Sequence, residues 1–338
     1  MIDERPPYLA HLGGEWVFSA PSEVPSIWGD AEEVAWPQGE TLIIAGTDGA
    51  GKTVLAQNLI IRQAGIIDDP FLGLTVTPRR RVLYLAQDRP RQAQRAFQRL
   101  VGLVDRDTLD EGLAVIDWPV EMLIEEDPEL LVRLATENEA DTLYVDSLKD
   151  ICAEPSTEVT GLAVRRAYSL CIAEGIEVCL LHHDRKATSD SKRRILKLAD
   201  VYGSRFITAG AGSVIALNGG SGDPVIDLRH LKQPSQEVGP LRLSLDFATG
   251  EMEIFQGSDI YGILRNAKNG VTANDAARHL YGTEAPTAKE RERARRKLES
   301  AVGRDRAHKK PGDRANEPTR YFSTEATLTV PLTEEVLA

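Results

Sequence analysis

One short stretch carries the clearest chemistry in the sequence. Residues 46–53 read GTDGAGKT and fit the pattern G-x-x-x-x-G-K-[ST]. Glycines at this spacing let backbone N–H groups close around phosphate oxygens, and a helix that starts here adds the positive end of its dipole. We expect Lys52 to reach the β- and γ-phosphates and Thr53 to join the shell of a Mg²⁺ ion. The stretch predicts a nucleoside-triphosphate site made by Gly46, Thr47, Asp48, Gly49, Ala50, Gly51, Lys52 and Thr53.

A second feature is an apolar strand that ends in a carboxylate. LYVD, at residues 143–146, delivers Asp146 at the carboxyl end of a strand about ninety residues after Lys52. A carboxylate in this place binds Mg²⁺, usually through water. We therefore expect Thr53 and Asp146 to hold Mg²⁺ together beside bound ATP.

Hydrolysis also needs a group that orients and activates water. Asp88 follows the next strand after the phosphate loop, and His182 and His183 end the strand after the one that carries Asp146. Because strand ends line the ligand crevice of a parallel sheet, we expect all three residues near the γ-phosphate. An alternative for Asp88 is that it caps the helix that follows it. A zinc site of Cys179, His182 and His183 lacks a second pair of closely spaced ligands, so the nucleotide role is favoured.

These residues need a sheet to position them, and the hydrophobic pattern predicts one. Between residues 41 and 183, short apolar runs alternate with segments whose apolar residues recur at helical spacing. Such alternation is typical of an α/β fold, a parallel sheet covered by helices on both faces. The expected strands are 41–45, 81–86, 113–117, 142–146 and 177–183, and the expected helices are 52–65, 91–104, 127–137 and 161–174.

The pattern changes after residue 200 and again after residue 257. Strands separated by Gly, Pro and Asp turns predict an antiparallel extension of one sheet edge, at 213–218, 225–232, 241–247 and 251–255. Three short helices and a hairpin then have the outline of a winged helix-turn-helix, with helices at 259–267, 271–282 and 286–303, a basic loop at 304–319 and a last strand within 320–327. The expected organisation is an N-terminal segment (1–36), an ATPase domain (37–256), a winged-helix domain (257–327) and a tail (328–338).

Composition limits the class of protein. The 338 residues are 42% hydrophobic and 27% charged, a mixture typical of globular domains. No apolar run approaches the roughly eighteen residues of a membrane span, and the first residues lack the features of a signal peptide. The three cysteines, Cys152, Cys171 and Cys179, make no disulfide framework. We expect a cytoplasmic protein with no membrane contact.

Charge is unevenly distributed along the chain. The net charge is −12, yet residues 289–320 hold twelve basic and six acidic residues. Such a local patch sets the field near a polyanion more than the total charge does. A second basic cluster comprises Arg185, Lys186, Lys192, Arg193, Arg194 and Lys197. For either cluster taken alone, solvated helix faces and loops are the simpler explanation.

Together the motifs resemble the RecA superfamily of P-loop ATPases, specifically the RepA-like branch of hexameric replicative helicases and the related AAA-family ATPases of phages and mobile elements. The resemblance covers about residues 27–255 and rests on GTDGAGKT, VLYLAQDRP, LYVDSL, LLHHDRK, YGSRFITAGAGSV and LKQPSQEVGP in that order. It implies a RecA-like fold with ATP and Mg²⁺ as cofactors. It also implies single-stranded DNA, replication proteins and further copies of the chain as partners, with a hexamer favoured.

The resemblance further implies roles for the water-activating and sensing residues. Asp88 takes the place of a catalytic glutamate, so its carboxylate is one methylene shorter than in the family. His182 and His183 match paired histidines that couple the γ-phosphate to DNA-binding loops. The stretch 184–199 then resembles a loop that faces the channel of a ring, which makes its six basic residues DNA contacts.

Cationic groups that act on the ATP of a neighbouring subunit are also implied. Arg205, Arg229 and Lys232 are the candidates, since GSR and LKQ resemble segments that present such groups. The sequence departs from the family here. It reads TAGAG where relatives place a finger arginine, and LKQ where related helicases have Lys-x-Arg.

The last helix of the C-terminal domain resembles a recognition helix. Arg293, Arg296 and Lys297 would contact DNA phosphates and the major groove, beside the basic wing at 304–319. Many winged helices bind only proteins, and acidic neighbours dilute the charge of this helix. DNA contact is favoured because the ATPase motifs independently indicate a nucleic-acid partner.

The leading interpretation is a DNA-dependent ATPase, a ring-forming replicative DNA helicase that couples ATP hydrolysis to movement on single-stranded DNA. A filament-forming recombination or repair ATPase carries the same motifs. An ATP-switched DNA-binding regulator is an alternative of another class, and the short Asp88 side chain favours it if hydrolysis is slow. Duplex unwinding separates the helicase from both alternatives.

Overall fold

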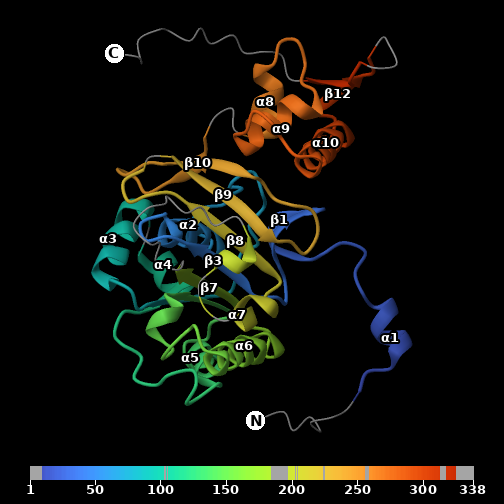
Figure 1. Ribbon diagram of the computed structural model, residues 1–338. Helices are drawn as coiled ribbons and strands as arrows, with labels where there is room; N and C mark the ends of the chain where they lie inside the picture. The colour runs from blue at the N-terminus through green and yellow to red at the C-terminus, as the bar shows by residue number, and fades with distance from the viewer. Residues whose placement is uncertain are drawn as a thin grey trace.

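The computed structural model describes residues 10–102, 104, 106–183, 197–201, 203, 205–223, 225–255, 259–312 and 317–324. Within them a nine-stranded sheet forms the centre of the molecule (Figure 1). Its order is β11 (Met252–Ile254), β10 (Leu241–Leu245), β9 (Val225–Lys232), β8 (Ser213–Asn218), β3 (Leu42–Gly46), β7 (Glu177–His183), β6 (Thr142–Asp146), β4 (Val82–Ala86) and β5 (Leu113–Ile116).

The sheet is parallel from β8 to β5 and antiparallel from β8 to β11. The predicted parallel sheet with an antiparallel edge is therefore confirmed. Because parallel strands end together, the carboxyl ends of β3, β4, β6 and β7 lie along one edge of the sheet. That edge receives the residues predicted to bind the nucleotide.

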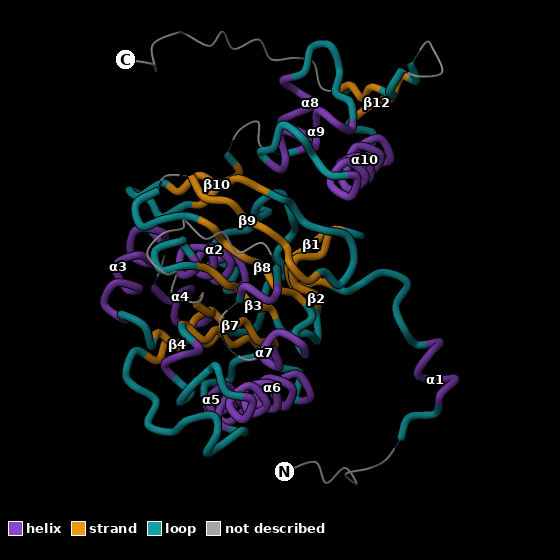
Figure 2. The backbone as a smooth tube through the Cα atoms, in the orientation of Figure 1, coloured by secondary structure: helices purple, strands orange, loops and turns teal. Residues whose placement is uncertain are grey.

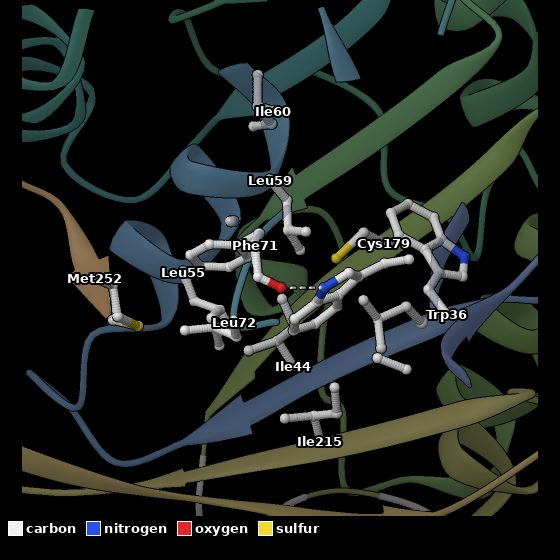
Figure 3. Packing of buried hydrophobic residues seen from close by; sticks show 14 of the residues in the cluster. Trp36, Ile44, Leu55, Leu59, Ile60, Phe71, Leu72, Cys179, Ile215 and Met252 are labelled. Carbon is white, nitrogen blue, oxygen red and sulfur yellow. Dashed lines mark hydrogen bonds between the residues drawn. The ribbon is translucent and has the colours of Figure 1, made fainter. Parts of the chain in front are cut away.

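Helices cover both faces of the sheet, so its strands are apolar throughout. One face packs on α2 (Lys52–Gln63) and α3 (Pro90–Val101), and the other on α5 (Leu130–Glu137), α6 (Glu158–Ala173) and α7 (Arg205–Ala209). In Figure 3, Leu55 and Leu59 of α2 lie over Ile44 of β3. The preceding residue, Ile43, belongs to the core on the other face. Smaller elements are α4 (Arg106–Gly112) and 3₁₀ turns at Leu148–Asp150 and Leu198–Asp200.

A hairpin of β1 (Ser26–Asp30) and β2 (Glu33–Pro37) completes the first of these cores. Trp28 is buried, its Nε1 donates to the Phe71 carbonyl at 3.0 Å, and its ring stacks on Phe71 at 5.5 Å between centroids. Trp36 is buried against Tyr144. The sequence predicts that the N-terminal segment (1–36) precedes the ATPase domain. The last residues of this segment instead belong to the core of that domain. The pairing of β1 with β2 shifts register on both sides of Trp28, which breaks the alternation that sequence patterns detect.

The N-terminal helix α1 (Gly13–Phe18) stands away from the sheet (Figure 2). It has no buried residue, and the side chains of Leu12, Trp16, Val17 and Phe18 are all largely exposed. Across the described part of the chain, no helix combines the length and apolarity that a membrane span requires.

The C-terminal residues form a second, smaller body beside the antiparallel edge (Figure 1). It contains α8 (Ile260–Asn266), α9 (Ala273–Tyr281), α10 (Ala288–Gly303) and a hairpin of β12 (Ala307–Lys310) and β13 (Arg320–Ser323), around a core of its own. Capping boxes begin the second and third helices, with Thr272 bonded to Asp275 and Thr287 to Glu290. The structure therefore has the three helices and hairpin expected from the sequence.

Candidate nucleotide site

The predicted phosphate loop connects β3 to α2 and curls around the Lys52 ammonium. Lys52 Nζ donates to the carbonyl oxygens of Gly46 at 2.9 Å and Thr47 at 3.0 Å. Gly49 and Gly51 have φ angles of +78° and +87°, which glycine adopts without strain. A Cβ on Gly49 would also lie 2.7 Å from the Cβ of Ser221. Burial lowers the pKa of Lys52, and the carboxylates of the site oppose that shift.

The two residues predicted to hold Mg²⁺ are in direct contact. Thr53 Oγ1, in the first turn of α2, donates to Asp146 Oδ2 at 2.7 Å. Asp146 ends β6 and is buried, and this burial raises its pKa, while hydrogen bonds from Tyr84 and Thr53 lower it. A hydroxyl and a carboxylate are hard oxygen ligands of the kind Mg²⁺ prefers, so this pair fits the ion. When bound, Mg²⁺ would neutralise charge that develops on the transferring phosphate.

The two histidines at the end of β7 point to opposite faces of the sheet. His183 Nδ1 lies 2.7 Å from Asp48 Oδ1 in the phosphate loop, and its Nε2 lies 3.8 Å from Asp88 Oδ2. His182 is buried on the other face, where its Nε2 would lie 3.3 Å from a Cβ on Gly203. The structure thus brings His183 to the site, and it places His182 away from it. Successive residues of a strand alternate in this way.

Asp88 lies where β4 leads into α3, among cationic side chains. Its carboxylate is 3.6 Å from Lys149 Nζ and 3.9 Å from Arg89 Nε. Burial lowers the pKa of His183, and Lys52 and Lys149 lower it further, so the imidazole is neutral at pH 7. A neutral His183 beside Asp88 leaves that carboxylate able to accept a proton from water.

A cleft of about 300 Å³ joins these groups to α3 and to the turn between β10 and β11. Its walls include Arg89, Arg99, Phe247 and Lys149, none of which is among the predicted site residues. Lys149 could have been predicted from the sequence, because it follows Asp146 by three residues in LYVDSLK. The sequence predicts a strand at 241–247, which would include Phe247. In the structure β10 ends at Leu245, and the Phe247 side chain is 54% exposed at the rim of the cleft.

None of the candidates for action on a neighbouring subunit lines this cleft. Lys232 Nζ donates to the carbonyl oxygens of Thr208, Ala209 and Ala211, at the end of α7. Arg229 lies over the Tyr281 ring, 5.5 Å from its centroid. Arg205 is exposed at the start of α7. Lys232 is thus occupied within its own chain, and Arg205 is the most exposed of the three candidates.

The predicted DNA contacts divide into two groups. Arg185, Lys186, Lys192, Arg193 and Arg194 lie outside the described residues, and Lys197 is exposed. On α10, Lys297 Nζ donates to the Glu237 carbonyl at 2.7 Å, and Arg293 Nη1 lies 3.3 Å from Glu237 Oε2. The side chain of Arg296 is 66% exposed. Of these three helix cations, two face the ATPase domain and Arg296 faces solvent.

The zinc alternative finds no support. In the ranges that the structure describes, no three His, Cys, Asp or Glu side chains are grouped as a metal site. Cys179 is buried with the α2 core, and His182 lies on the opposite face of the same strand.

Comparison with known proteins agrees with this geometry. Residues 8–189 match the model of the AAA domain family, more than half of the chain. The chain belongs to the AAA domain family. With the RecA-like sheet and the phosphate loop of this member, the predicted class of P-loop ATPase is confirmed.

One solved structure also matches part of the chain. The KaiC-like protein of the hyperthermophilic archaeon Pyrococcus horikoshii OT3 is 14% identical over 65% of this chain and 90% of that chain, with a TM-score of 0.44. Among curated proteins, none matches the sequence.

Proposed function

We propose that this AAA-domain protein is a DNA-dependent ATPase of the replicative helicase kind, which couples ATP hydrolysis to movement on single-stranded DNA. The contact between His183 and the phosphate loop is the observation that carries the proposal. His183 ends β7, touches Asp48, and lies two residues before Arg185, the first cation of the basic stretch. A movement of His183 caused by a change at the γ-phosphate would therefore be transmitted to that stretch through only a few main-chain bonds.

The chemical step follows from the residues around the cleft. Backbone N–H groups of the phosphate loop and the Lys52 ammonium bind the β- and γ-phosphates, and Thr53 and Asp146 hold Mg²⁺. Asp88 orients a water molecule and accepts its proton as the bond between the γ-phosphorus and the bridging oxygen breaks. The products are ADP and phosphate. Phe247, exposed at the rim, offers an aromatic face to the base.

Coupling to DNA would begin at His183. A γ-phosphate bound in the loop would compete with Asp48 for His183, because it would bring a second anion to the loop whose carboxylate His183 contacts. Release of that contact shifts the end of β7 and the basic residues after it. Lys197, near the end of that stretch, is exposed and can meet a phosphate backbone.

The oligomeric part of the proposal rests on two exposed features. Leu12, Trp16, Val17 and Phe18 gather apolar surface on a helix that no described residue covers, and a second copy of the chain would cover it. Arg205 is exposed and lies outside its own chain's cleft, where it is available to a neighbour's phosphates. A ring, with a hexamer favoured, satisfies both.

An ATP-switched DNA-binding regulator is the second candidate. Asp88 favours it, because a short carboxylate that lies against Lys149, Arg89 and His183 is less free to orient water, which predicts slow turnover. In this case the C-terminal body would be a winged helix that carries DNA specificity, and hydrolysis would only reset assembly.

The deciding experiment is steady-state ATP hydrolysis by the wild-type protein and Lys52→Ala, each with and without single-stranded DNA. The proposal expects stimulation by DNA in the wild type and no turnover in Lys52→Ala, followed by displacement of a paired strand. Hydrolysis that ignores DNA would favour the regulator. Unchanged turnover in Lys52→Ala would refute the assignment of the site.

A further inference from the structure

A buried phenol reaches the carboxylate that is predicted to hold Mg²⁺. Tyr84 lies on β4 and its side chain is 1% exposed. The register pairs Ala86 with Asp146, so Tyr84, two residues earlier, points to the same face of the sheet. Its hydroxyl donates to Asp146 Oδ2 at 2.7 Å. Tyr84 is thus a neighbour of the metal site that does not line the nucleotide cleft.

Two hydroxyls end on the same carboxylate oxygen. Thr53 Oγ1 and Tyr84 Oη both donate to Oδ2, each at 2.7 Å, and neither engages Oδ1. Thr53 belongs to the helix that starts at the phosphate loop. Tyr84 belongs to the sheet, on the strand beside Asp146. The bond from Tyr84 therefore fixes the carboxylate to the sheet independently of the loop.

The Tyr84 ring is held from several sides. It packs edge-on against Phe97 of α3, 5.5 Å between centroids, and Gln57 of α2 hydrogen bonds to the phenol. The Gln57 amide also donates to the Ala93 carbonyl of α3 at 3.0 Å. A side chain locked by β4, α2 and α3 can impose an orientation on its partner.

Main-chain bonds join the same two strand ends. The N–H groups of Gln87 and Asp88 donate to the Asp146 carbonyl at 2.7 and 2.9 Å. Asp146 is thus tied to the end of β4 by its backbone and by its side chain. The strand that carries Tyr84 leads four residues later to Asp88, the candidate for water activation.

We propose that Tyr84 is a positioning residue for Mg²⁺, which orients Asp146 through Oδ2 and leaves Oδ1 for the metal shell. The inference rests on the proposed binding of Mg²⁺ and ATP. The need for such a donor is geometric, because a carboxylate can turn about its Cβ–Cγ bond, and a directional hydrogen bond from a fixed ring restricts that rotation.

The test is Tyr84→Phe, which removes one hydroxyl and keeps the ring. Calorimetry would measure the dissociation constant of a non-hydrolysable ATP analogue with Mg²⁺ and with EDTA. We expect the EDTA value to stay within about twofold of wild type and the gain in affinity from Mg²⁺ to fall about tenfold, the effect of one lost hydrogen bond to a charge. An undiminished gain, or an equal loss with and without Mg²⁺, would overturn the proposal.

Tyr144→Phe is the matched control. Tyr144 pairs with Tyr84 in register on β6 and is equally buried, but its hydroxyl donates to Gln63 Oε1 at 2.7 Å. It should keep the full gain from Mg²⁺, and a similar fall in both variants would show that loss of any core phenol is responsible. If Tyr84→Phe does not fold, 3-fluorotyrosine at position 84 of the otherwise wild-type chain replaces it. Its ¹⁹F resonance should move when Mg²⁺ is added to the nucleotide complex, and a fixed resonance would count against the role.

The two proposals fail in different ways. A wild-type protein that binds no nucleotide refutes the proposed function, and with it the role of Tyr84. A wild-type protein that gains affinity from Mg²⁺, beside a Tyr84→Phe variant that gains as much, refutes the role of Tyr84 alone.

Discussion

The ammonium group of Lys297 donates to the main-chain carbonyl of Glu237 at 2.7 Å and so joins α10 to the loop that follows β9. Lys297 Nζ also lies 3.5 Å from Glu33 Oε1, and Arg304 Nη1 lies 3.2 Å from Glu33 Oε2. A cavity of about 440 Å³ adjoins these contacts between the two bodies. Docking of the C-terminal body therefore depends on a few partly buried ion pairs more than on close packing.

Lys297→Ala should weaken this docking. The change leaves Glu33 and the Glu237 carbonyl short of a partner, and breaking a buried pair in this way destabilises by about 3 kcal/mol. Hydrogen exchange of α10 and the radius of gyration from X-ray scattering would report it, as faster exchange and a larger radius. Arg296→Ala is the control, since its exposed side chain pairs only within α10 and should change stability by less than about 0.5 kcal/mol. Equal effects of the two changes would contradict the ion-pair account.

The contact of Asp48 with His183 predicts a trade between ATP affinity and coupling. Asp48→Asn removes a negative charge from the phosphate loop, so the affinity for an ATP analogue should rise about threefold to tenfold. The same variant should lose most of the stimulation of hydrolysis by single-stranded DNA, because His183 then lacks the loop carboxylate that it would exchange for the γ-phosphate. Asp223→Asn, in the loop after β8, is a control for charge near the site. Higher affinity with intact stimulation would remove Asp48 from the coupling scheme.

Basic residues after β7 predict a particular dependence on salt. If Arg193 and Arg194 contact two phosphates, changing both to Ala should reduce the slope of log affinity against log salt by about 1.4 for single-stranded DNA. Fluorescence anisotropy over a salt series would measure it. Arg165→Ala with Arg166→Ala, an adjacent exposed pair on α6 that no DNA prediction includes, removes the same charge and serves as the control. An unchanged slope in the first variant would exclude the stretch as a DNA contact.

Much of the fold followed from local pattern, and the errors have physical causes. The parallel strands β3 and β6 were predicted within a residue or two because both faces are covered and the runs are apolar throughout. The short helix α7 has no repeat from which to detect it. The contact of α10 with the ATPase domain could not be predicted, for a different reason. Spacing four apart puts Arg293 and Lys297 on one face, but it does not say whether that face meets DNA or the ATPase domain.

The site shows the same division. Motif spacing located Lys52, Thr53 and Asp146, because each lies at the end of a recognisable element. The separation of His182 from His183 was implicit in the strand, since neighbours alternate between faces. Tyr84 could not be found from the sequence. Its role depends on β4 lying beside β6 in register, and sequence order alone does not determine which strands are neighbours.

Acid should destabilise the ATPase domain through His230. Its ring lies buried between β8 and the loop after β9, with one nitrogen 2.9 Å from Ser213 Oγ and Nδ1 accepting from the Val238 N–H at 3.2 Å. Burial, with a smaller contribution from Lys297, lowers the pKa of His230 to about 3. The unfolded chain has a histidine pKa of about 6.5, so between pH 6.5 and pH 3 it binds a proton at His230 that the folded state does not bind. Above the unfolded pKa of about 6.5, His230 costs the folded state nothing. As the pH falls from there toward 3, the free energy of unfolding decreases, and the loss due to His230 is about 2 kcal/mol at pH 5.

Urea unfolding at pH 7.5 and pH 5 would measure this effect for the wild type, His230→Gln and His279→Gln. His230→Gln should be less stable at pH 7.5 because it alters the buried bonds, but its loss between the two pH values should be smaller than that of the wild type by about 2 kcal/mol. His279 is exposed on α9, and its variant should keep the wild-type loss. The comparison isolates His230 because the carboxylates that titrate over this range are common to all three proteins. A His230→Gln protein that loses as much stability as the wild type would assign the acid sensitivity to those carboxylates instead.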